Sequence, residues 1–477
     1  MTGTAAPRLR VREIRLLERD VRFRMPFRFG VVTLTGAPEA FVRVRVALED
    51  GREGWGMAAE MLAPKWFDKN PLLSNEDNFE QLRSAIGMAR ALYLAGRDLD
   101  SAFGLFAKRH PQQVAACAER GLNPLIASFG AALIDRAILD ALLRLTGTSF
   151  FDGIRANLPG LQAVDFVPET RGFDFSAFLS TLRPGDRINA RHTVGMVDPT
   201  TAADQTEERR LNDGLPETLE EVVNAYGHRY FKLKVGGSLE PDIQRLLAIA
   251  SVLDHNPDPY YVSLDGNEQY DSVEGINELW TKIEETPGLH RLADSILFIE
   301  QPINRRVALD ADISELAKQR PVIIDESDAD FDAFPRARSL GYRGISSKTC
   351  KGLYRSLVNV ARCTIWNREE AGGGYFMSAE DLTTQAGVSV QQDLALVSLI
   401  GCQHVERNGH HYVRGMAGIP EREQRAFLAA HPDLYREVEG VVCLRIEDGQ
   451  LAIRSLACEG FAVGAEPDWP AMRQVGS

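Results

Sequence analysis

Charged residues recur at the ends of short apolar runs in the second half of this chain, at intervals of roughly 23–35 residues. Such an interval is about the length of one strand plus one helix, the repeat of a barrel built from alternating strands and helices. A barrel brings the ends of its strands to one rim, so charges remote in sequence can meet there. The five sites are Lys232 with Lys234 in YFKLKVGG, Asp265 in YVSLDGN, Glu300 in ILFIEQP, Asp325 in PVIIDES and Lys348 in GISSKTCKG.

Three of these sites are carboxylates that each close a run typical of a strand buried on both faces: Asp265, Glu300 and Asp325. An unpaired carboxylate there is costly, and three on adjacent strands would repel one another unless a cation lay among them. Oxygen ligands favour Mg²⁺, with Mn²⁺ as a substitute. The alternative is that each residue separately caps a helix in a strand–helix loop.

Two neighbours of these carboxylates are candidates for supporting roles. Asp325 and Glu326 are adjacent, so only one of them can face the interior of a regular strand. We favour Asp325 as the ligand because it follows the apolar run directly, and we expect Glu326 to pair with a lysine. Asn267 lies two residues beyond Asp265 on the same side, where it could support the metal shell.

The lysines are candidate acids and bases. Lys232 and Lys234 are two apart on a predicted strand, so both point into the barrel, and their proximity should lower the pKa of at least one. A lysine with a near-neutral pKa can act as a general base. Lys348 ends the strand after Asp325, across the cavity from Lys234. The alternatives are solvated lysines on an edge strand and, for Lys348, a Schiff base, which would not need the carboxylates.

Composition limits the class of protein. The 477 residues suit a barrel plus an accessory domain, and the net charge of −13 argues against a nucleic-acid or anionic-membrane surface. The six cysteines have no CxxC pairing, which predicts reduced thiols and a cytoplasmic location. The first residues, MTGTAAPRLRVREIR, have no apolar core, so neither a signal peptide nor a membrane span is indicated.

The two ends of the chain have strand patterns. Residues 41–48 alternate apolar and Arg residues, and residues 9–23 resemble an antiparallel neighbour. The stretch 75–146 is predicted to be mostly helical. Near the C-terminus, VVCLRI and LAIRSLA flank Asp448-Gly449, which predicts a hairpin, and we expect it to complete the N-terminal sheet. The predicted parts are a cap at 1–160, a barrel at 187–435 and a C-terminal segment at 436–477 that completes the cap.

In this order the motifs resemble those of the enolase superfamily, in its muconate lactonizing enzyme and mandelate racemase-like branch, with the muconate lactonizing enzyme-like group favoured. The match extends to AALIDRAILDALLRLTG, similar to the helix before the family's barrel, and to RMPFRFGVVTLTG, similar to its substrate-capping loop. The barrel motifs that carry the resemblance are K-x-K at 232–234, D-x-N at 265–267, EQP at 300–302, DES at 325–327 and Lys348.

The resemblance implies a modified TIM barrel, (β/α)₇β, with an α+β capping domain formed from the N-terminal region and the C-terminal tail. It implies that Lys234 and Lys348 are the acid and base on opposite faces of the substrate, and that Lys232 tunes Lys234 and contacts a carboxylate oxygen. It also implies a lid over the barrel mouth, and a Mg²⁺ ion that neutralises an enolate. The implied ligands are Asp265, Glu300 and Asp325, and the implied lid residues are Phe27, Phe29 and Thr33.

The chain departs from the family at the ends of the seventh and eighth predicted strands, which lack the Asp-x-Asp of dipeptide epimerases. We predict a polar substrate contacted at this rim, with Arg407 as a bidentate carboxylate partner. A rim of salt bridges is the alternative, and a His410-His411 metal site is a further one. The candidate substrate-binding residues are Glu380, Asp381, Glu406, Arg407 and Asn408.

The reaction predicted from these residues is Mg²⁺-dependent removal of the proton α to a carboxylate, giving a metal-stabilised enolate. We favour a racemase, epimerase or cycloisomerase that acts on a small carboxylate or amino-acid derivative, in a homo-oligomer. Two lysines on opposite faces allow one to remove the proton and the other to return it. A lyase or dehydratase and a non-catalytic, metal-dependent carboxylate-binding protein are the alternatives.

Overall fold

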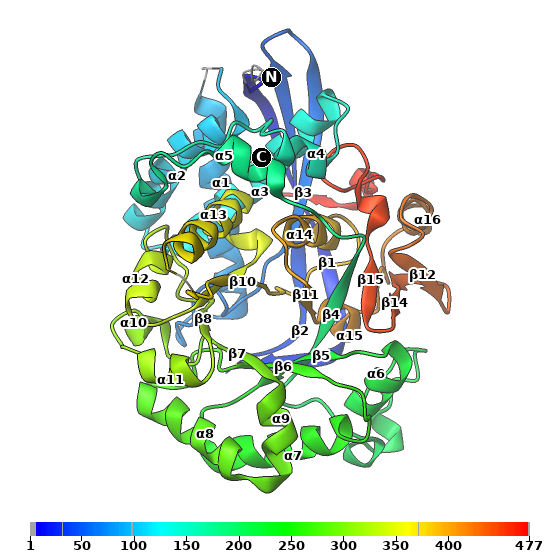
Figure 1. The fold of residues 1–477 in the computed structure, drawn as a ribbon. Helices are drawn as coiled ribbons and strands as arrows, with labels where there is room; N and C mark the ends of the chain where they lie inside the picture. Colours follow the sequence, from blue (N-terminus) through cyan, green and yellow to red (C-terminus); the bar gives the residue numbers. More distant parts are fainter. Residues whose placement is uncertain (1–5, 31, 97–98, 371, 476–477) are drawn as a thin grey trace.

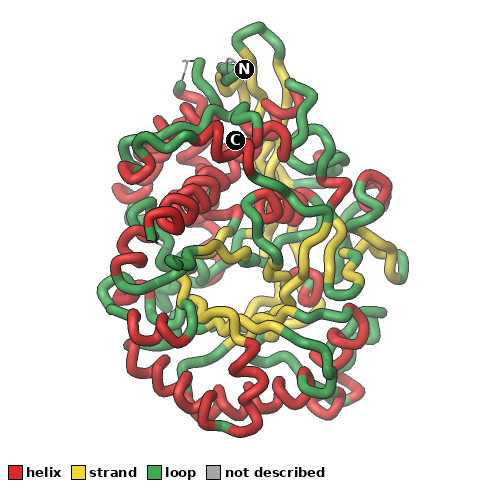
Figure 2. The backbone as a smooth tube through the Cα atoms, viewed as in Figure 1, coloured by secondary structure: helices red, strands yellow, loops and turns green. Residues whose placement is uncertain are grey.

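A closed barrel of eight parallel strands lies beneath a cap with an antiparallel sheet, which confirms the predicted fold class. The structure is a computed structural model that describes residues 6–30, 32–96, 99–370 and 372–475. Figure 2 shows strands in the centre of the barrel and helices on its outside. Strand β11 pairs in parallel with β4 and closes the barrel. The barrel strands are β4 (Arg187–Val194), β5 (Tyr230–Lys234), β6 (Tyr261–Asp265), β7 (Ile296–Glu300), β8 (Val322–Ile324), β9 (Gly344–Ser347), β10 (Phe376–Ala379) and β11 (His404–Arg407).

Helices connect successive barrel strands and cover the barrel from outside (Figure 1). The first begins where Thr218 and Glu221 form a capping box and ends at Gly227, whose φ of 67° is left-handed. No helix in the described ranges has both the length and the apolar character needed to cross a membrane. The helices are α6 (Leu219–Tyr226), α7 (Leu239–Leu253), α8 (Val273–Glu285), α9 (His290–Ser295), α10 (Arg305–Ala308), α11 (Ser314–Gln319), α12 (Ala333–Ser339), α13 (Leu353–Glu369) and α14 (Val388–Leu399), followed after β11 by α15 (Gly409–Tyr412) and α16 (Glu421–Ala430).

The cap has a four-stranded antiparallel sheet in the order β16-β1-β2-β3, covered by helices. The predicted strands at 9–23 and 41–48 are antiparallel neighbours, and the stretch 75–146 is mostly helical, as predicted. The cap strands are β1 (Leu9–Phe29), β2 (Val32–Leu48), β3 (Glu53–Met61) and β16 (Arg473–Gln474), and the helices are α1 (Asn75–Ala95), α2 (Ala102–Glu119), α3 (Pro124–Leu145), α4 (Phe150–Arg155) and α5 (Phe175–Thr181).

Helix α3 fastens the cap to the barrel. It approaches β3 so closely that a Cβ added at Gly56 would lie 2.1 Å from the backbone oxygen of Ala137, which leaves room only for glycine. On the barrel side, Arg136 of α3 pairs with Glu60 of β3 at 2.9 Å and donates to Gln392 of α14 at 3.3 Å. The pair is fully buried, so cap and barrel share one interior at this point.

The C-terminal hairpin forms at Asp448-Gly449 as predicted, but its predicted sheet is wrong. Its strands are β14 (Ile446–Glu447) and β15 (Gln450–Ala452), and β15 pairs with β4 of the barrel. The reason is that β4 begins pairing with β5 only at Arg191. The first residues of β4 therefore offer backbone groups that β15 can satisfy. The segment before the hairpin forms a separate pair, β12 (Tyr435–Val438) with β13 (Val441–Leu444), and only β16 of the C-terminal tail joins the cap sheet.

Candidate functional site

A small cavity of about 30 Å³ lies between the cap and the ends of the barrel strands, with Lys232, Lys234 and Lys348 among its lining residues. Lys234 ends β5 and Lys348 follows β9, four strands further around an eight-stranded barrel. The two ammonium groups therefore enter the cavity from opposite sides. The other lining residues are Phe27, Phe29, Leu34, Ala63, Trp66, Asn267, Asp381, Leu382, Thr383, Glu406 and Asn408.

The three predicted metal ligands lie on consecutive strands and are fully buried. Asp265 and Glu300 are the last residues of β6 and β7 and are register partners, and Asp325 directly follows β8. Lys234 Nζ lies 2.5 Å from Asp265 Oδ2, and Lys348 Nζ lies 2.6 Å from Asp325 Oδ2. Each predicted base is thus paired with a predicted ligand.

Lys232 occupies the centre of a ring of four carboxylates. Its Nζ lies 2.9 Å from Asp265, 2.7 Å from Glu300, 2.7 Å from Glu380 and 2.9 Å from Glu406. The last two come from the ends of β10 and β11, so the interior charges of five strands converge on one ammonium group. Lys232 is therefore the buried counter-ion of the barrel.

The surrounding charges set the pKa values. Burial alone would lower the pKa of Lys232, but the carboxylates around it raise that pKa well above its usual value, opposite to the direction expected from a lysine pair alone. Burial opposes the charge of Lys348 too, and Asp325 outweighs it and raises the pKa. Burial and the neighbouring Asp265 raise the pKa of Glu300 well above its usual range.

The donor set suits a hard cation. Asn267 Oδ1 and Glu326 Oε2 are buried oxygens that accept no hydrogen bond. Oxygen atoms that lack donors are the ligands that Mg²⁺ prefers, so the residues fit the ion that the resemblance implies. Within the described ranges, however, the carboxylates of Asp265, Glu300 and Asp325 are not gathered to within 4.8 Å of one another. Because lysines stand between them, a cation here would have to displace an ammonium group.

Gln301 fixes the position of Asp325. Its Oε1 accepts hydrogen bonds from the backbone N of Asp325 at 2.9 Å and of Ser327 at 3.0 Å. Its own φ is 32°, a left-handed conformation that non-glycine residues seldom adopt. The sequence assigned no role to Gln301, although it is the middle residue of the EQP motif.

Asn267 and Glu326 are linked to each other and to the cap. Asn267 Nδ2 donates to Glu326 Oε1 at 3.2 Å. The lysine near Glu326 is Lys69, from the cap segment between β3 and α1, at 3.7 Å; the same Nζ lies 2.5 Å from Glu268. The expected lysine partner of Glu326 thus comes from outside the barrel, in a segment with no pattern that could have indicated it.

The rim residues separate into two groups. Asp381, Glu406 and Asn408 line the cavity, and Asp381 accepts from the backbone N of Asn408 at 2.9 Å. Arg407 does not line it, because it is the residue after inward-facing Glu406 and so points out of the barrel. There it is buried against Asp393 of α14 and lies 3.4 Å from Asp381. The structure gives Arg407 the salt-bridged arrangement that was the alternative.

Glu380 lies behind the cavity rather than on its wall. Arg191 of β4 and Lys232 both contact its carboxylate. Burial opposes ionisation of Glu380, but these two cations prevail and lower its pKa to about 2. Its role in this geometry is to hold Lys232.

The predicted lid segment is the tip of the β1–β2 hairpin. Phe27 and Phe29 line the cavity, and Phe27 stacks on Tyr412 of α15 with ring centroids 4.2 Å apart. Thr33 is exposed, and the next residue, Leu34, faces the cavity, as strand alternation requires. Trp66, which sequence reasoning missed, places its ring 4.4 Å from Lys348 Nζ.

The fold and the site define a class: a barrel protein with buried lysines and carboxylates at the strand ends, closed by a cap from both chain ends. The sequence model of the family described as Enolase C-terminal domain-like matches residues 214–398. The match covers most of the barrel and confirms the predicted resemblance to the enolase superfamily. No curated protein matches the sequence.

Solved structures extend the similarity over the whole fold. A muconate lactonizing enzyme from Mucobacterium smegmatis, complexed with muconolactone, is 18% identical with a TM-score of 0.61, covering 98% of this chain and 100% of that one. A dipeptide epimerase from Cytophaga hutchinsonii, complexed with Mg and a dipeptide, is 15% identical with a TM-score of 0.59, covering 98% and 99%. A 2-chloromuconate cycloisomerase from Rhodococcus opacus 1CP is 20% identical with a TM-score of 0.57, covering 96% and 97%. At these identities the likeness concerns the fold.

Proposed function

We propose that this chain is a Mg²⁺-dependent enzyme that removes the proton α to a carboxylate, and that it is a racemase, epimerase or cycloisomerase of a small carboxylate or amino-acid derivative. The observation that carries the proposal is the opposed placement of Lys234 and Lys348 around one cavity. A substrate held between the two lysines can lose its α-proton to a neutral amine on one side, and the planar enolate that forms can regain a proton from the ammonium group on the other side.

In this proposal Asp265, Glu300 and Asp325 hold Mg²⁺, with Mn²⁺ as a substitute. When bound, the ion supplies positive charge for the oxygens of the substrate carboxylate. Lys234 and Lys348 are both paired with these ligands in the structure, at 2.5 Å and 2.6 Å. Positive charge at these carboxylates would replace both ion pairs and so leave the side chains of Lys234 and Lys348 free to face the substrate.

The remaining residues of the cavity bind and enclose the substrate. Phe27, Phe29 and Trp66 form an apolar wall opposite the charges, which excludes water and accepts the distal group of the substrate. We further propose that the enzyme works as a homo-oligomer in the cytoplasm. The proposed cytoplasmic location is supported by the six cysteines, which are all free thiols in the structure, because the cytoplasm keeps thiols reduced.

The test is proton exchange in D₂O, followed by NMR, over a library of chiral carboxylates. We expect exchange of the α-proton, lost on EDTA treatment and restored by Mg²⁺ or Mn²⁺, and reduced in Asp265→Asn. Net unsaturation would instead indicate a lyase. Binding without exchange would indicate a carboxylate-binding protein, and exchange that survives exhaustive chelation would exclude the carboxylates as essential ligands.

A further inference from the structure

Three buried histidines face one another on the outer side of the barrel wall, away from the lysine cavity. On β4, Arg191 and Thr193 point inward, where they contact Glu380 and Glu406. His192 between them therefore points outward. There it meets two histidines of other segments, His228 just before β5 and His410 of α15, and all three side chains are buried.

The ring nitrogens have the spacing of a metal site. One nitrogen from each of His192, His228 and His410 lies within 4.8 Å of the others, the one such group of three among the described residues. His192 Nδ1 and His410 Nε2 are 3.4 Å apart. A tetrahedral Zn²⁺ with Zn–N bonds of about 2.0–2.1 Å places its ligands about 3.3–3.4 Å apart. That pair already has the separation of two ligands on one ion.

His228 is oriented as a metal-binding histidine would be. Its Nδ1 lies 2.9 Å from the backbone oxygen of Ala190, so Nδ1 carries the proton and donates it there. That hydrogen bond leaves Nε2 with a lone pair, and Nε2 is buried without a hydrogen-bond partner. A histidine that donates one nitrogen to a carbonyl and directs the other at an ion is the usual arrangement in protein metal sites.

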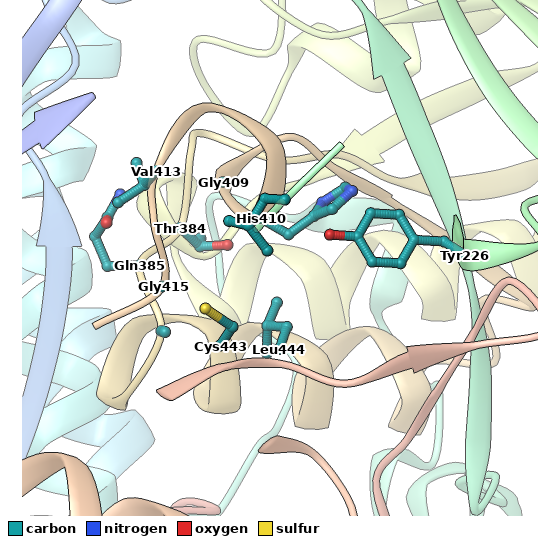
Figure 3. A pocket seen from close by; sticks show the side chains of 11 residues that line it. Tyr226, Thr384, Gln385, Gly409, His410, Val413, Gly415, Cys443 and Leu444 are labelled. Atoms are coloured by element: carbon teal, nitrogen blue, oxygen red, sulfur yellow. The ribbon is translucent and has the colours of Figure 1, made fainter. Parts of the chain in front are cut away.

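The surroundings keep the rings neutral, the form that binds metals. Burial, the largest cause, lowers the pKa of His228 to about 4 and those of His192 and His410 well below their usual value. A small cavity adjoins His410, and Figure 3 shows the Tyr226 hydroxyl directed toward that side chain. This cavity of about 10 Å³ can supply a water molecule as a fourth ligand.

We propose that His192, His228 and His410 form a second metal site, for a divalent transition metal of the Zn²⁺ type, separate from the oxygen ligands inside the barrel. Neutral imidazole nitrogens select Zn²⁺, Co²⁺ or Ni²⁺ over Mg²⁺. The ion joins β4, the start of β5 and α15, close to where β11 pairs with β4. It therefore stabilises the part of the barrel where β11 pairs with β4.

Cobalt is the probe, because its visible absorption bands report the coordination geometry. The full-length protein is stripped with chelator, saturated with Mg²⁺ to fill the oxygen ligands, and titrated with Co²⁺. We expect one equivalent to bind with the intense bands of a four-coordinate site that has three imidazole ligands. Zn²⁺ should bleach these bands stoichiometrically and raise the melting temperature of the wild-type protein.

Variants assign the ligands. His192→Ala, His228→Ala and His410→Ala should each weaken Co²⁺ binding by at least ~10-fold, since even indirect changes at metal sites cost about that much. Exposed His255, replaced by Ala, is the matched control and should leave the spectrum unchanged. Because a buried histidine variant could fail to fold, the wild-type titration is decisive by itself. Absence of the bands, or bands that survive in folded ligand variants, would overturn the proposal.

Discussion

The barrel wall and the cap wall of the lysine cavity differ in chemistry. On the barrel side lie charges that are buried and paired, such as Lys232 among its four carboxylates. On the cap side lie rings, including Phe27, Phe29 and Trp66, whose contacts are stacking and dispersion. Charge placement depends on hydrogen bonds to a rigid sheet, whereas an apolar wall tolerates changes of shape. We infer that the barrel determines the reaction and the cap determines which substrate undergoes it.

The largest effect should follow from removing either base. Lys234→Ala and Lys348→Ala should each lower turnover by at least ~10²-fold, as the loss of a general acid or base does. If the reaction is a racemisation, each variant should still exchange the α-proton of one enantiomer. The measurement is enantiomer-resolved exchange in D₂O, with exposed Lys318→Ala as control. Undiminished exchange of both enantiomers would show that the replaced lysine has no role in the mechanism. It would also contradict the inference that barrel residues determine the reaction.

The next effect concerns the stability of the barrel. Lys232→Met should destabilise the protein by about 3–5 kcal/mol, because it leaves buried carboxylates without their cation. Urea unfolding measures the loss, and Mg²⁺ should restore part of it by supplying positive charge. Lys318→Met, at an exposed site, should change the free energy of unfolding by less than about 0.5 kcal/mol. An equally small change for Lys232→Met would contradict its role as the buried counter-ion.

The cap has a buried carboxyl group of its own, which makes the stability of the protein depend on pH in a predictable direction. Tyr93 donates to Asp135 of α3, and burial raises the pKa of Asp135 to about 8. Between about pH 4 and pH 8 the folded protein keeps a proton that the unfolded chain releases, so stability falls as pH rises, by up to about 1.4 kcal/mol per pH unit.

Asp135→Asn should remove this dependence and so raise the melting temperature more at pH 8.5 than at pH 5.5. Glu119→Gln, exposed on α2, is the control that should leave the pH profile as in the wild type. A parallel profile for wild type and Asp135→Asn would show that the carboxyl is ionised in the folded cap.

The smallest effect should come from the hairpin tip. Phe27→Ala and Phe29→Ala should change KM or substrate preference several-fold, in line with about 1 kcal/mol for an aromatic contact, while Mg²⁺ affinity stays unchanged. Phe173→Ala, in an aromatic cluster elsewhere in the cap, should leave KM as it is. A fall in kcat without any change in KM would show that the hairpin tip contributes to the reaction step and not to substrate selection.

The barrel residues could be predicted because each follows an apolar run at a regular interval. Side chains alternate between the two faces of a strand, and so Lys232 and Lys234, two residues apart, were predicted to share the inward face. Arg407 was assigned to the substrate because its side chain suits a carboxylate, but the same alternation on β11 turns it outward. Lys69 and Trp66 come from an irregular segment whose path depends on how the cap docks, which no local pattern encodes.

Contacts between strands that are distant in the sequence were the other feature that could not be predicted from the sequence. The turn residues Asp448-Gly449 predict the hairpin. Its pairing with β4, however, depends on the residues at the start of β4 that do not pair with β5, and no local sequence pattern indicates these. Likewise, His410 was considered with its sequence neighbour His411. The structure instead groups it with His192 and His228, which share no motif with it and meet only because the barrel closes.

The ring of carboxylates around Lys232 bears on the order of events when the protein is made. Because Lys232 supplies a positive charge inside the barrel, the newly synthesised chain can fold before it binds any metal ion. Under the proposed function, we expect the metal to enter a protein that is already folded, with the metal-free form as a stable precursor. We expect newly synthesised chains to wait for magnesium in a resting state, with activation limited by ion supply instead of by folding.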